Sequence, residues 1–322
     1  MRHIEQVTVF GGSGFIGRQI ARALAHQGYR VKVAARRPEF AESIKTAGDV
    51  GQVILVRANL RMSDSVVAAV AGSQAVINAA GIPFERGKQR YQDVHALGSW
   101  AIAEASSAAG VQRLIHISGL GADDRVSKNR FVRSKVEAES SVVRAFPNAT
   151  ILRPSVVFGP EDAFFNKLAR IAAMAPVVPL VGDGSAKLQP VYVGDVARAA
   201  VKVLERPDTA RTVFELGGPR VYSYRELVAL TLKEIDRKKP MLPLPAALMK
   251  LAGFFAEFQP ALLGPPPITR DQADLLTRDN IVRAGARTLA DLGIEPTAAE
   301  AILPTYLDRF RPAGRYNQTA PV

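Results

Sequence analysis

The sequence predicts an α/β fold: a doubly wound parallel Rossmann sheet with a smaller, mostly helical C-terminal domain. Three observations predict it. Short apolar runs alternate with helical patterns over the first half of the chain, and a glycine-rich turn joins the first run to the first helix. After residue 219 the alternation stops and proline-framed helical segments follow. Alternating strands and helices form a parallel sheet covered on both faces, and right-handed crossovers wind it in both directions.

The expected elements follow in order. Short apolar runs, most with β-branched residues, predict strands at 7–10, 29–34, 53–56, 75–78, 113–117 and 150–153. Apolar residues repeating every three or four positions predict helices at 15–27, 39–46, 91–109 and 128–145. The first of these helices ends at Gly28 and the third at Gly110. A further helix at 195–205 and a strand at 212–216 return the chain to the sheet.

The regular alternation of strands and helices ends after Arg153, and this sets the expected domain boundaries. Residues 1–218 form the cofactor domain, with 161–189 contributing to the second domain. Residues 219–312 form a small helical, proline-rich docking domain, and 313–322 form a tail. The apolar stretch 246–258 is expected to be a helix. It is either a core or interface helix, or one that lies on lipid or on a hydrophobic subunit.

The composition excludes several kinds of site. The chain has 322 residues and no cysteine, which excludes disulfides, thiolate metal ligands and a cysteine nucleophile. His3, His26, His95 and His116 lack the spacing of a helical zinc motif, so no metal site is expected. No apolar run reaches the roughly 18 residues of a spanning helix. Because the first strand starts soon after Met1, we expect no signal or transit peptide.

The charge is strongly basic and spread along the sequence. There are 42 lysines and arginines against 30 acidic residues, a formal charge of +12. Two interpretations remain: a solvated basic surface, and a docking face for an acidic protein or anionic lipid. Nucleic acid is not an expected partner, because no nucleic-acid-binding motif accompanies the charge.

The strongest motif is a glycine-rich turn that follows a strand and opens a helix. It consists of Gly11, Gly12, Ser13, Gly14, Phe15, Ile16 and Gly17. Gly11 and Gly14 permit a tight turn close to a phosphate, and Gly17 lets the helix pack near the strand. Free N–H groups and the positive end of the helix dipole then favour a pyrophosphate. The motif predicts a dinucleotide cofactor.

Arg36 and Arg37 end the second expected strand. Arg36 lies 19 residues beyond Gly17, where an NAD site would place an acidic residue for the ribose hydroxyls. An arginine accommodates a 2′-phosphate instead. A charge-assisted hydrogen bond contributes about 1.5–3 kcal/mol, which implies a preference of roughly 10- to 100-fold. The sequence therefore predicts NADPH.

Further cofactor contacts are expected where other strands end. Asn59 and Leu60 follow the third strand, where the adenine edge would lie. The small residues Ala79, Ala80 and Gly81 follow the fourth strand and would let the backbone lie along the cofactor. Ser118 follows the fifth strand and is either a ligand of a substrate carbonyl or a turn serine. Lys135 is expected at the ribose hydroxyls.

Together these motifs resemble the short-chain dehydrogenase/reductase superfamily, in its extended or atypical branch. The resemblance covers most of residues 6–217. It rests on the glycine-rich turn, Asn78-Ala-Ala-Gly81, Ser118, Lys135 and the segment 152–160. It implies that the nicotinamide is lined by Pro154, Ser155, Val156 and Val157.

The superfamily carries a Tyr-x-x-x-Lys motif, whose phenol gives or takes a proton while the cofactor moves hydride. This chain has Phe131 four residues before Lys135. A benzene ring has no exchangeable proton, so general acid–base catalysis is impossible at this position. We therefore assign no catalytic residue and expect cofactor binding to be retained.

Further segments resemble the nucleotide-binding accessory subunit of respiratory complex I, the NADH:ubiquinone oxidoreductase. They are 159–166, 279–282, 292–297, 304–307 and 314–316. The resemblance implies a non-catalytic NADPH-holding structural or assembly subunit at the junction of the peripheral and membrane arms. Its expected partners are other complex I subunits, with anionic lipid at the membrane surface as a further candidate.

The same resemblance implies a peripheral position on the cytoplasmic side of a bacterial inner membrane. For a processed eukaryotic chain the equivalent position is the matrix side. Two alternatives stay open. One is an active NADPH-dependent reductase or epimerase for a small carbonyl substrate, with its proton from Ser118, Tyr91 or water. The other is a sensor that reports the NADPH state to a partner.

Overall fold

The structure is a computed structural model that describes residues 4–257, 266, 268–312 and 314. The chain folds into two compact units. The first unit comprises Met1–Pro154, Val193–Leu216 and Arg283–Glu295. The second comprises Ser155–Tyr192, Gly217–Val282 and Pro296–Val322. Because each unit draws on three segments, the chain passes from one to the other repeatedly.

The first unit is built on a seven-stranded sheet with the order β11-β6-β5-β4-β1-β2-β3. Every pairing in it is parallel. The strands are β1 (Gln6–Phe10), β2 (Arg30–Ala35), β3 (Val53–Arg57), β4 (Ala75–Asn78), β5 (Arg113–Ile117), β6 (Thr150–Pro154) and β11 (Val213–Leu216). The strand order reverses beside β1, where doubly wound sheets bind ligands at their carboxyl ends. The predicted doubly wound sheet is confirmed.

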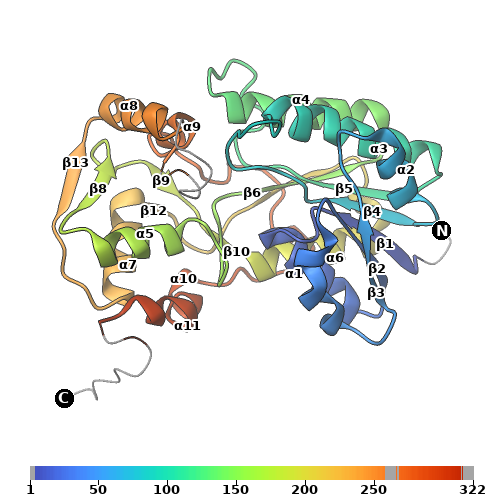
Figure 1. Cartoon of the computed structure of the whole chain (residues 1–322), viewed down its shortest axis with the longest axis horizontal. Helices are drawn as coiled ribbons and strands as arrows, with labels where there is room; N and C mark the ends of the chain where they lie inside the picture. The colour runs from blue at the N-terminus through green and yellow to red at the C-terminus, as the bar shows by residue number, and fades with distance from the viewer. Residues whose placement is uncertain (1–3, 258–265, 267, 313, 315–322) are drawn as a thin grey trace. The chain divides into compact units, whose positions relative to one another are not determined.

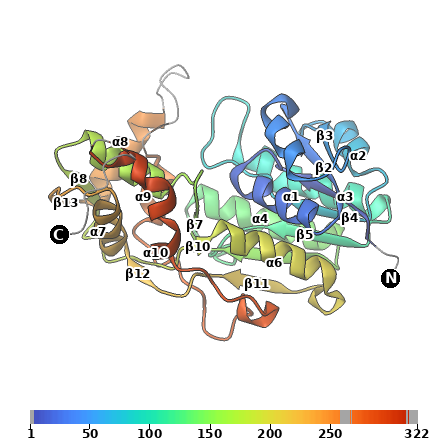
Figure 2. The ribbon, with the colours of Figure 1, turned by 90° about the horizontal axis from the view of Figure 1, so that it is seen from below.

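Helices cover both faces of this sheet. On one face α1 (Phe15–His26) and α6 (Val193–Glu205) lie side by side (Figures 1 and 2). The other face carries α2 (Ser63–Val70), α3 (Gly98–Ala108) and α4 (Arg130–Ala145). The sequence analysis missed α2, because its apolar residues form a short run without a clear helical repeat.

Two expected helices differ in type. The segment Pro38–Ala47 is a 3₁₀ helix, and we have no physical account of its tighter winding. The expected helix 91–109 begins with a π-helical turn, Gln92–Leu97, before α3. Gly98 at the junction is closely packed, because a Cβ there would lie 2.9 Å from Leu60 Cδ1. π-Helical turns are frequent at functional sites, and this one carries His95.

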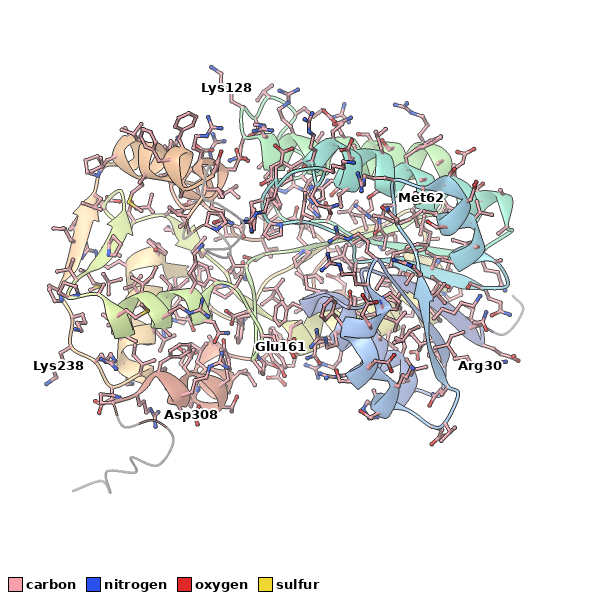
Figure 3. All side chains as sticks on the ribbon, in the orientation of Figure 1. Arg30, Met62, Lys128, Glu161, Lys238 and Asp308 are labelled. Carbon is pink, nitrogen blue, oxygen red and sulfur yellow. The ribbon has the colours of Figure 1, made fainter. Side chains whose placement is uncertain are left out.

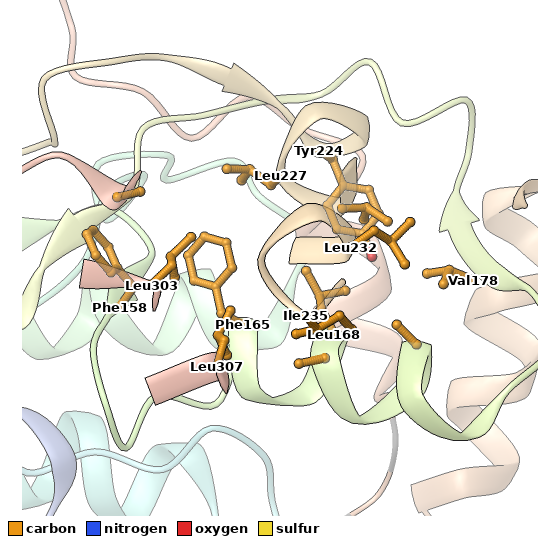
Figure 4. Close-up of a cluster of buried hydrophobic side chains, with 14 of the residues drawn as sticks. Phe158, Phe165, Leu168, Val178, Tyr224, Leu227, Leu232, Ile235, Leu303 and Leu307 are labelled. Carbon is orange, nitrogen blue, oxygen red and sulfur yellow. The ribbon is translucent and has the colours of Figure 1, made fainter. Parts of the chain in front are cut away.

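The second unit contains short strand pairs and a helical core. Its strands are β7 (Val157–Phe158), β8 (Val178–Val181), β9 (Lys187–Leu188), β10 (Val191–Tyr192), β12 (Tyr222–Ser223) and β13 (Met241–Leu244). Its helices are α5 (Phe165–Met174), α7 (Tyr224–Glu234), α8 (Ala246–Glu257), α9 (Arg270–Leu275), α10 (Ala299–Ile302) and α11 (Pro304–Leu307). Figure 4 shows the core, where Phe165 and Leu227 lie near Leu303 and Leu307.

The boundaries differ from the expected ones at three places, and the smallest difference is that Gly217 and Gly218 belong to the second unit. The second unit contains all of Ser155–Tyr192 rather than 161–189, and the segment 283–295, expected in the docking domain, belongs to the first unit. Opposite charges explain the return: Arg283 Nε donates to the buried Glu215 at 2.9 Å and pairs with Asp123. The Glu215 N–H also donates to the Arg287 carbonyl at 2.8 Å.

The expected apolar helix 246–258 is α8, and Phe258 lies outside the described residues, as does the tail apart from Gly314. Leu248, Leu251 and Phe255 of α8 are 51%, 52% and 66% exposed. In the part of the chain that the structure describes, no helix is long and apolar enough to cross a membrane. Figure 3 shows Arg30 and Lys128 projecting from different sides of the first unit.

Candidate cofactor site

The glycine-rich turn packs directly against the end of β4. Gly11 has φ +71°, and a Cβ there would lie 2.7 Å from the Ala79 oxygen. A Cβ on Gly17 would lie only 2.2 Å from the Gly11 carbonyl oxygen, so the helix approaches the turn as closely as glycine permits. The Gly11 N–H donates to the Ala34 oxygen at 3.1 Å, which ties the turn to β2.

The first turn of α1 is open to an anion. Its N-cap is Gly14, no side chain caps it, and no acidic residue stands in its first turn. Arg18 donates to the Ser13 carbonyl at 2.9 Å and helps to hold the turn. The unpaired N–H groups and the positive end of the helix dipole therefore suit a pyrophosphate. The glycine-rich turn and the start of α1 together form a site that fits a phosphate group.

A cavity of about 180 Å³ lies at the carboxyl ends of β1, β2, β3 and β4. It brings together nine of the expected residues: Gly11, Ser13, Gly14, Arg36, Asn59, Leu60, Ala79, Ala80 and Gly81. The sequence analysis missed several others that line it, including Arg61, Ile82 and Gln89. The other expected residues do not line it: Gly12, Phe15, Ile16, Gly17, Arg37, Ser118, Lys135, Pro154, Ser155, Val156 and Val157. The volume is below the roughly 300–1,000 Å³ of whole small-molecule pockets.

Two arginines line this cavity from neighbouring strand ends. Burial, together with the charges of Arg37 and Arg61, lowers the pKa of Arg36. Among the described residues, no carboxylate pairs with Arg36 or Arg61. Arg37 lies over the Phe40 ring, 5.8 Å from its centroid. Two guanidinium groups with no carboxylate partner in the described part of the chain thus line a cavity beside the glycine-rich turn. Arg61 could have been predicted from the sequence, because it follows Asn59 by two residues at a strand end.

A second cluster of buried polar groups begins with Asn78, the last residue of β4. Its Nδ2 donates to Ser99 Oγ at 2.9 Å and lies 3.1 Å from His116 Nδ1. Since His116 Nδ1 accepts that bond, its proton is on Nε2. His116 Nε2 and Ser118 Oγ are both buried without a hydrogen-bond partner among the described residues. Buried polar atoms are normally paired, so these two suit a ligand. Burial lowers the pKa of His116 to about 3, which keeps it neutral.

His95 links the π-helical turn to α4. Its Nε2 accepts the Ile82 N–H at 3.0 Å, so its Nδ1 proton points to Ser134 Oγ at 2.8 Å. The Ser134 hydroxyl in turn donates to the Phe131 carbonyl at 2.6 Å. Burial, and then the nearby charge of Lys135, lower the pKa of His95 to about 2. His95 is therefore a neutral bridge that fixes the start of α4.

The start of α4 positions Phe131 and Lys135. Asn129 caps the helix by accepting the N–H of Phe131 at 3.1 Å, and the Phe131 ring lies edge-on to the rings of Tyr91 and His95, 5.6 Å from each. The Lys135 ammonium is 5.8 Å from the Phe131 centroid. Burial lowers the pKa of Lys135 to about 8. Phe131 thus presents an apolar ring, which has no exchangeable proton, beside Lys135.

Lys135 also lies close to the cavity, because a Cβ on Gly81 would be 3.8 Å from its Nζ.

Pro154 belongs to the first unit, where its carbonyl accepts the Leu120 N–H at 3.0 Å. Ser155, Val156 and Val157 belong to the second unit, and Ser155 Oγ donates to the Asn280 carbonyl there. Their role at a nicotinamide stays a prediction. No group of three or more potential metal ligands is present among the described residues.

Several known proteins are similar to this chain in sequence and in fold. Residues 7–217 match the NAD dependent epimerase/dehydratase family. A protein of Arabidopsis thaliana, NADH dehydrogenase (ubiquinone) 1 alpha subcomplex subunit 9, mitochondrial, is 34% identical over 316 residues, 95% of this chain and 78% of that one. The NADH-ubiquinone oxidoreductase 40 kDa subunit, mitochondrial, of Neurospora crassa is 32% identical over 312 residues, 96% and 80% of the two chains.

The fold is also similar to that of MoeE5 in complex with UDP-glucose and NAD. The TM-score is 0.71 at 20% identity, over 94% of this chain and 97% of that chain. The chain therefore belongs to the NAD dependent epimerase/dehydratase family, in the branch that contains these NADH–ubiquinone oxidoreductase subunits.

Proposed function

We propose that the protein is an accessory subunit of respiratory complex I that holds NADPH for structure or assembly and does not turn it over. The observation that carries this proposal is the pairing of an intact phosphate cradle with Phe131. The groups expected to bind a dinucleotide are present, whereas the group expected to move a proton is replaced by an apolar ring. The family relationship supports the assignment to complex I.

The preference for NADPH rests on the arginines at the cavity. The turn Gly11–Gly17 and the open end of α1 would hold the pyrophosphate. Arg36 and Arg61, without described acidic partners, would hold the 2′-phosphate. Lys135 would hold the nicotinamide ribose. The bound nicotinamide would supply hydride chemistry, but the substrate oxygen would find no phenol at position 131.

The proposed partners are other complex I subunits. The exposed apolar side chains Leu248, Leu251 and Phe255 of α8 favour a contact with a hydrophobic subunit. The charge of +12 favours additional attraction to anionic lipid. We place the protein at the periphery of the membrane, on the cytoplasmic side in a bacterium or the matrix side in a mitochondrion.

The test is native purification followed by nucleotide extraction. We expect the protein to migrate with complex I and to release NADPH in a one-to-one ratio. Arg36→Asp should weaken NADPH retention roughly 10- to 100-fold, by the strength of a charge-assisted bond. The matched control Arg144→Asp, on the exposed end of α4, should retain the nucleotide. Recovery of mainly NAD(H) would contradict the cofactor assignment.

The second candidate function is an active reductase or epimerase. One observation favours it: Ser118 Oγ and His116 Nε2 are buried donors that could bind a carbonyl oxygen. Turnover measurements with small carbonyl compounds separate the two functions. We expect no NADPH oxidation by the wild-type protein, and Phe131→Tyr should leave assembly intact. Oxidation at an ordinary enzymatic rate that Lys135→Ala abolishes would establish the reductase instead.

A further inference from the structure

The second unit contains an apolar cavity of about 360 Å³ that the proposed cofactor does not use. α5 contributes Leu168 and Ile171, β8 contributes Val181, and Met249 and Leu275 come from α8 and α9. Its volume lies within the roughly 300–1,000 Å³ of small-molecule sites. The neighbouring core is visible in Figure 4, where Leu168 and Tyr224 are labelled.

A lysine interrupts this apolar lining. Lys167 Nζ donates to Gln272 Oε1 at 3.3 Å, and both residues line the cavity. Burial is the whole cause of the lowered pKa of Lys167, and no described carboxylate offsets it. The nearby Asp274 is already engaged by Lys250 at 2.5 Å. An ammonium group in apolar surroundings is unfavourable without a counter-ion. An anion bound in the cavity beside Lys167 would therefore be stabilised.

A second polar group lines the same space. Tyr224 is only 4% exposed, and its hydroxyl makes no hydrogen bond to any residue that the structure describes. This phenol can therefore donate its proton to a bound group. The cavity therefore offers one positive charge and one hydroxyl against otherwise hydrophobic walls. No arginine is among the cavity's lining residues, which disfavours a doubly charged phosphate.

We propose that this cavity binds a single-chain carboxylic acid. The carboxylate would accept hydrogen bonds from Lys167 and Tyr224, and the alkyl chain would lie among Leu168, Ile171 and Val181. At about 30 Å³ for each water-sized atom, 360 Å³ holds about twelve non-hydrogen atoms, the size of decanoate. The inference is independent of the cofactor and of complex I, because every group that carries it belongs to the second unit.

Titration calorimetry on the full chain with sodium decanoate, below its micelle concentration, tests the proposal. We expect one saturable site per chain and no comparable binding of decanol, which lacks the charge. Lys167→Met should weaken decanoate binding roughly 10- to 100-fold, because it removes a charge-assisted hydrogen bond. Ile171→Trp, which fills the cavity, should abolish binding. Lys187→Met, an exposed lysine of β9 in the same unit, is the matched control and should bind as the wild type does.

Replacement of Lys167 by methionine removes a partly buried charge that no described carboxylate pairs with, so the variant should melt at or above the wild-type temperature. Equal binding of decanol and decanoate to the wild type would overturn the proposal without any variant. Unchanged decanoate affinity in Lys167→Met, or no saturable binding at all, would overturn it as well.

Discussion

The burial of Lys135 should make the stability of the protein depend on alkaline pH. Its side chain is 8% exposed, and burial lowers its pKa from 10.5 to about 8 although Glu139 acts in the opposite direction. Between these values the unfolded chain binds more protons than the folded one. The free energy of unfolding therefore rises with pH across this window and is lower on its acidic side. A pKa difference of about 2.5 corresponds to about 3 kcal/mol.

Denaturant unfolding of the nucleotide-free protein at a series of pH values measures this effect. We compare the wild type with Lys135→Met, which keeps the side-chain volume and removes the charge. The stability advantage of the variant should be largest at or below pH 8 and should shrink by about 3 kcal/mol as the pH approaches 10.5. Other titrating groups are shared by both proteins and cancel in the difference.

The matched control is Lys202→Met, an exposed lysine of α6 whose replacement should give no pH-dependent difference. A wild-type-to-variant difference that stays constant between pH 8 and 10.5 would refute the reasoning. It would mean that the ammonium of Lys135 is solvated in the folded protein.

Three further predictions follow from the first unit. His95 and His116 stay neutral in the folded protein, so lowering the pH below 6.5 should lower the unfolding free energy by about 2.7 kcal/mol per pH unit. The variant His116→Phe should show half of this pH dependence. Gly17→Ala forces the turn away from the Gly11 oxygen, and NADPH affinity by fluorescence titration should fall at least about tenfold. Arg113→Met breaks buried hydrogen bonds to the end of α6 and should cost about 2–4 kcal/mol in urea unfolding.

The sequence predicted most accurately the features that depend only on residues close together in the chain. β4 and β5 lie where they were expected, because a strand buried on both faces requires a continuous apolar run. The glycine-rich turn was predictable for a similar reason: its geometry depends on Gly11, Gly14 and Gly17 within one short segment. The adjoining Arg36 also lines the expected cavity.

What the sequence did not reveal depends on contacts between distant segments. The bond between His95 and Ser134 joins residues 39 positions apart, and Ser134 stands at a variable position of the Tyr-x-x-x-Lys segment. The burial that shifts the pKa of Lys135 arises only when α4 has packed on the sheet. The separate cavity at Lys167 likewise forms only where α5, β8 and α9 meet. No local sequence pattern predicts that meeting.

The return of residues 283–295 to the first unit also sets an order of events during synthesis. Glu215 is buried, and Arg283, which donates to it, lies 68 residues later in the chain. At roughly 5–20 residues per second, that guanidinium emerges from the ribosome several seconds after the carboxylate it neutralises. Until then Arg153, at 3.7 Å, is the cation that pairs with Glu215 in the first unit. A truncation that ends before Arg283 would remove residues 283–295 of the first unit together with this ion pair, so docking has to be tested by substitutions on α8 in the intact chain.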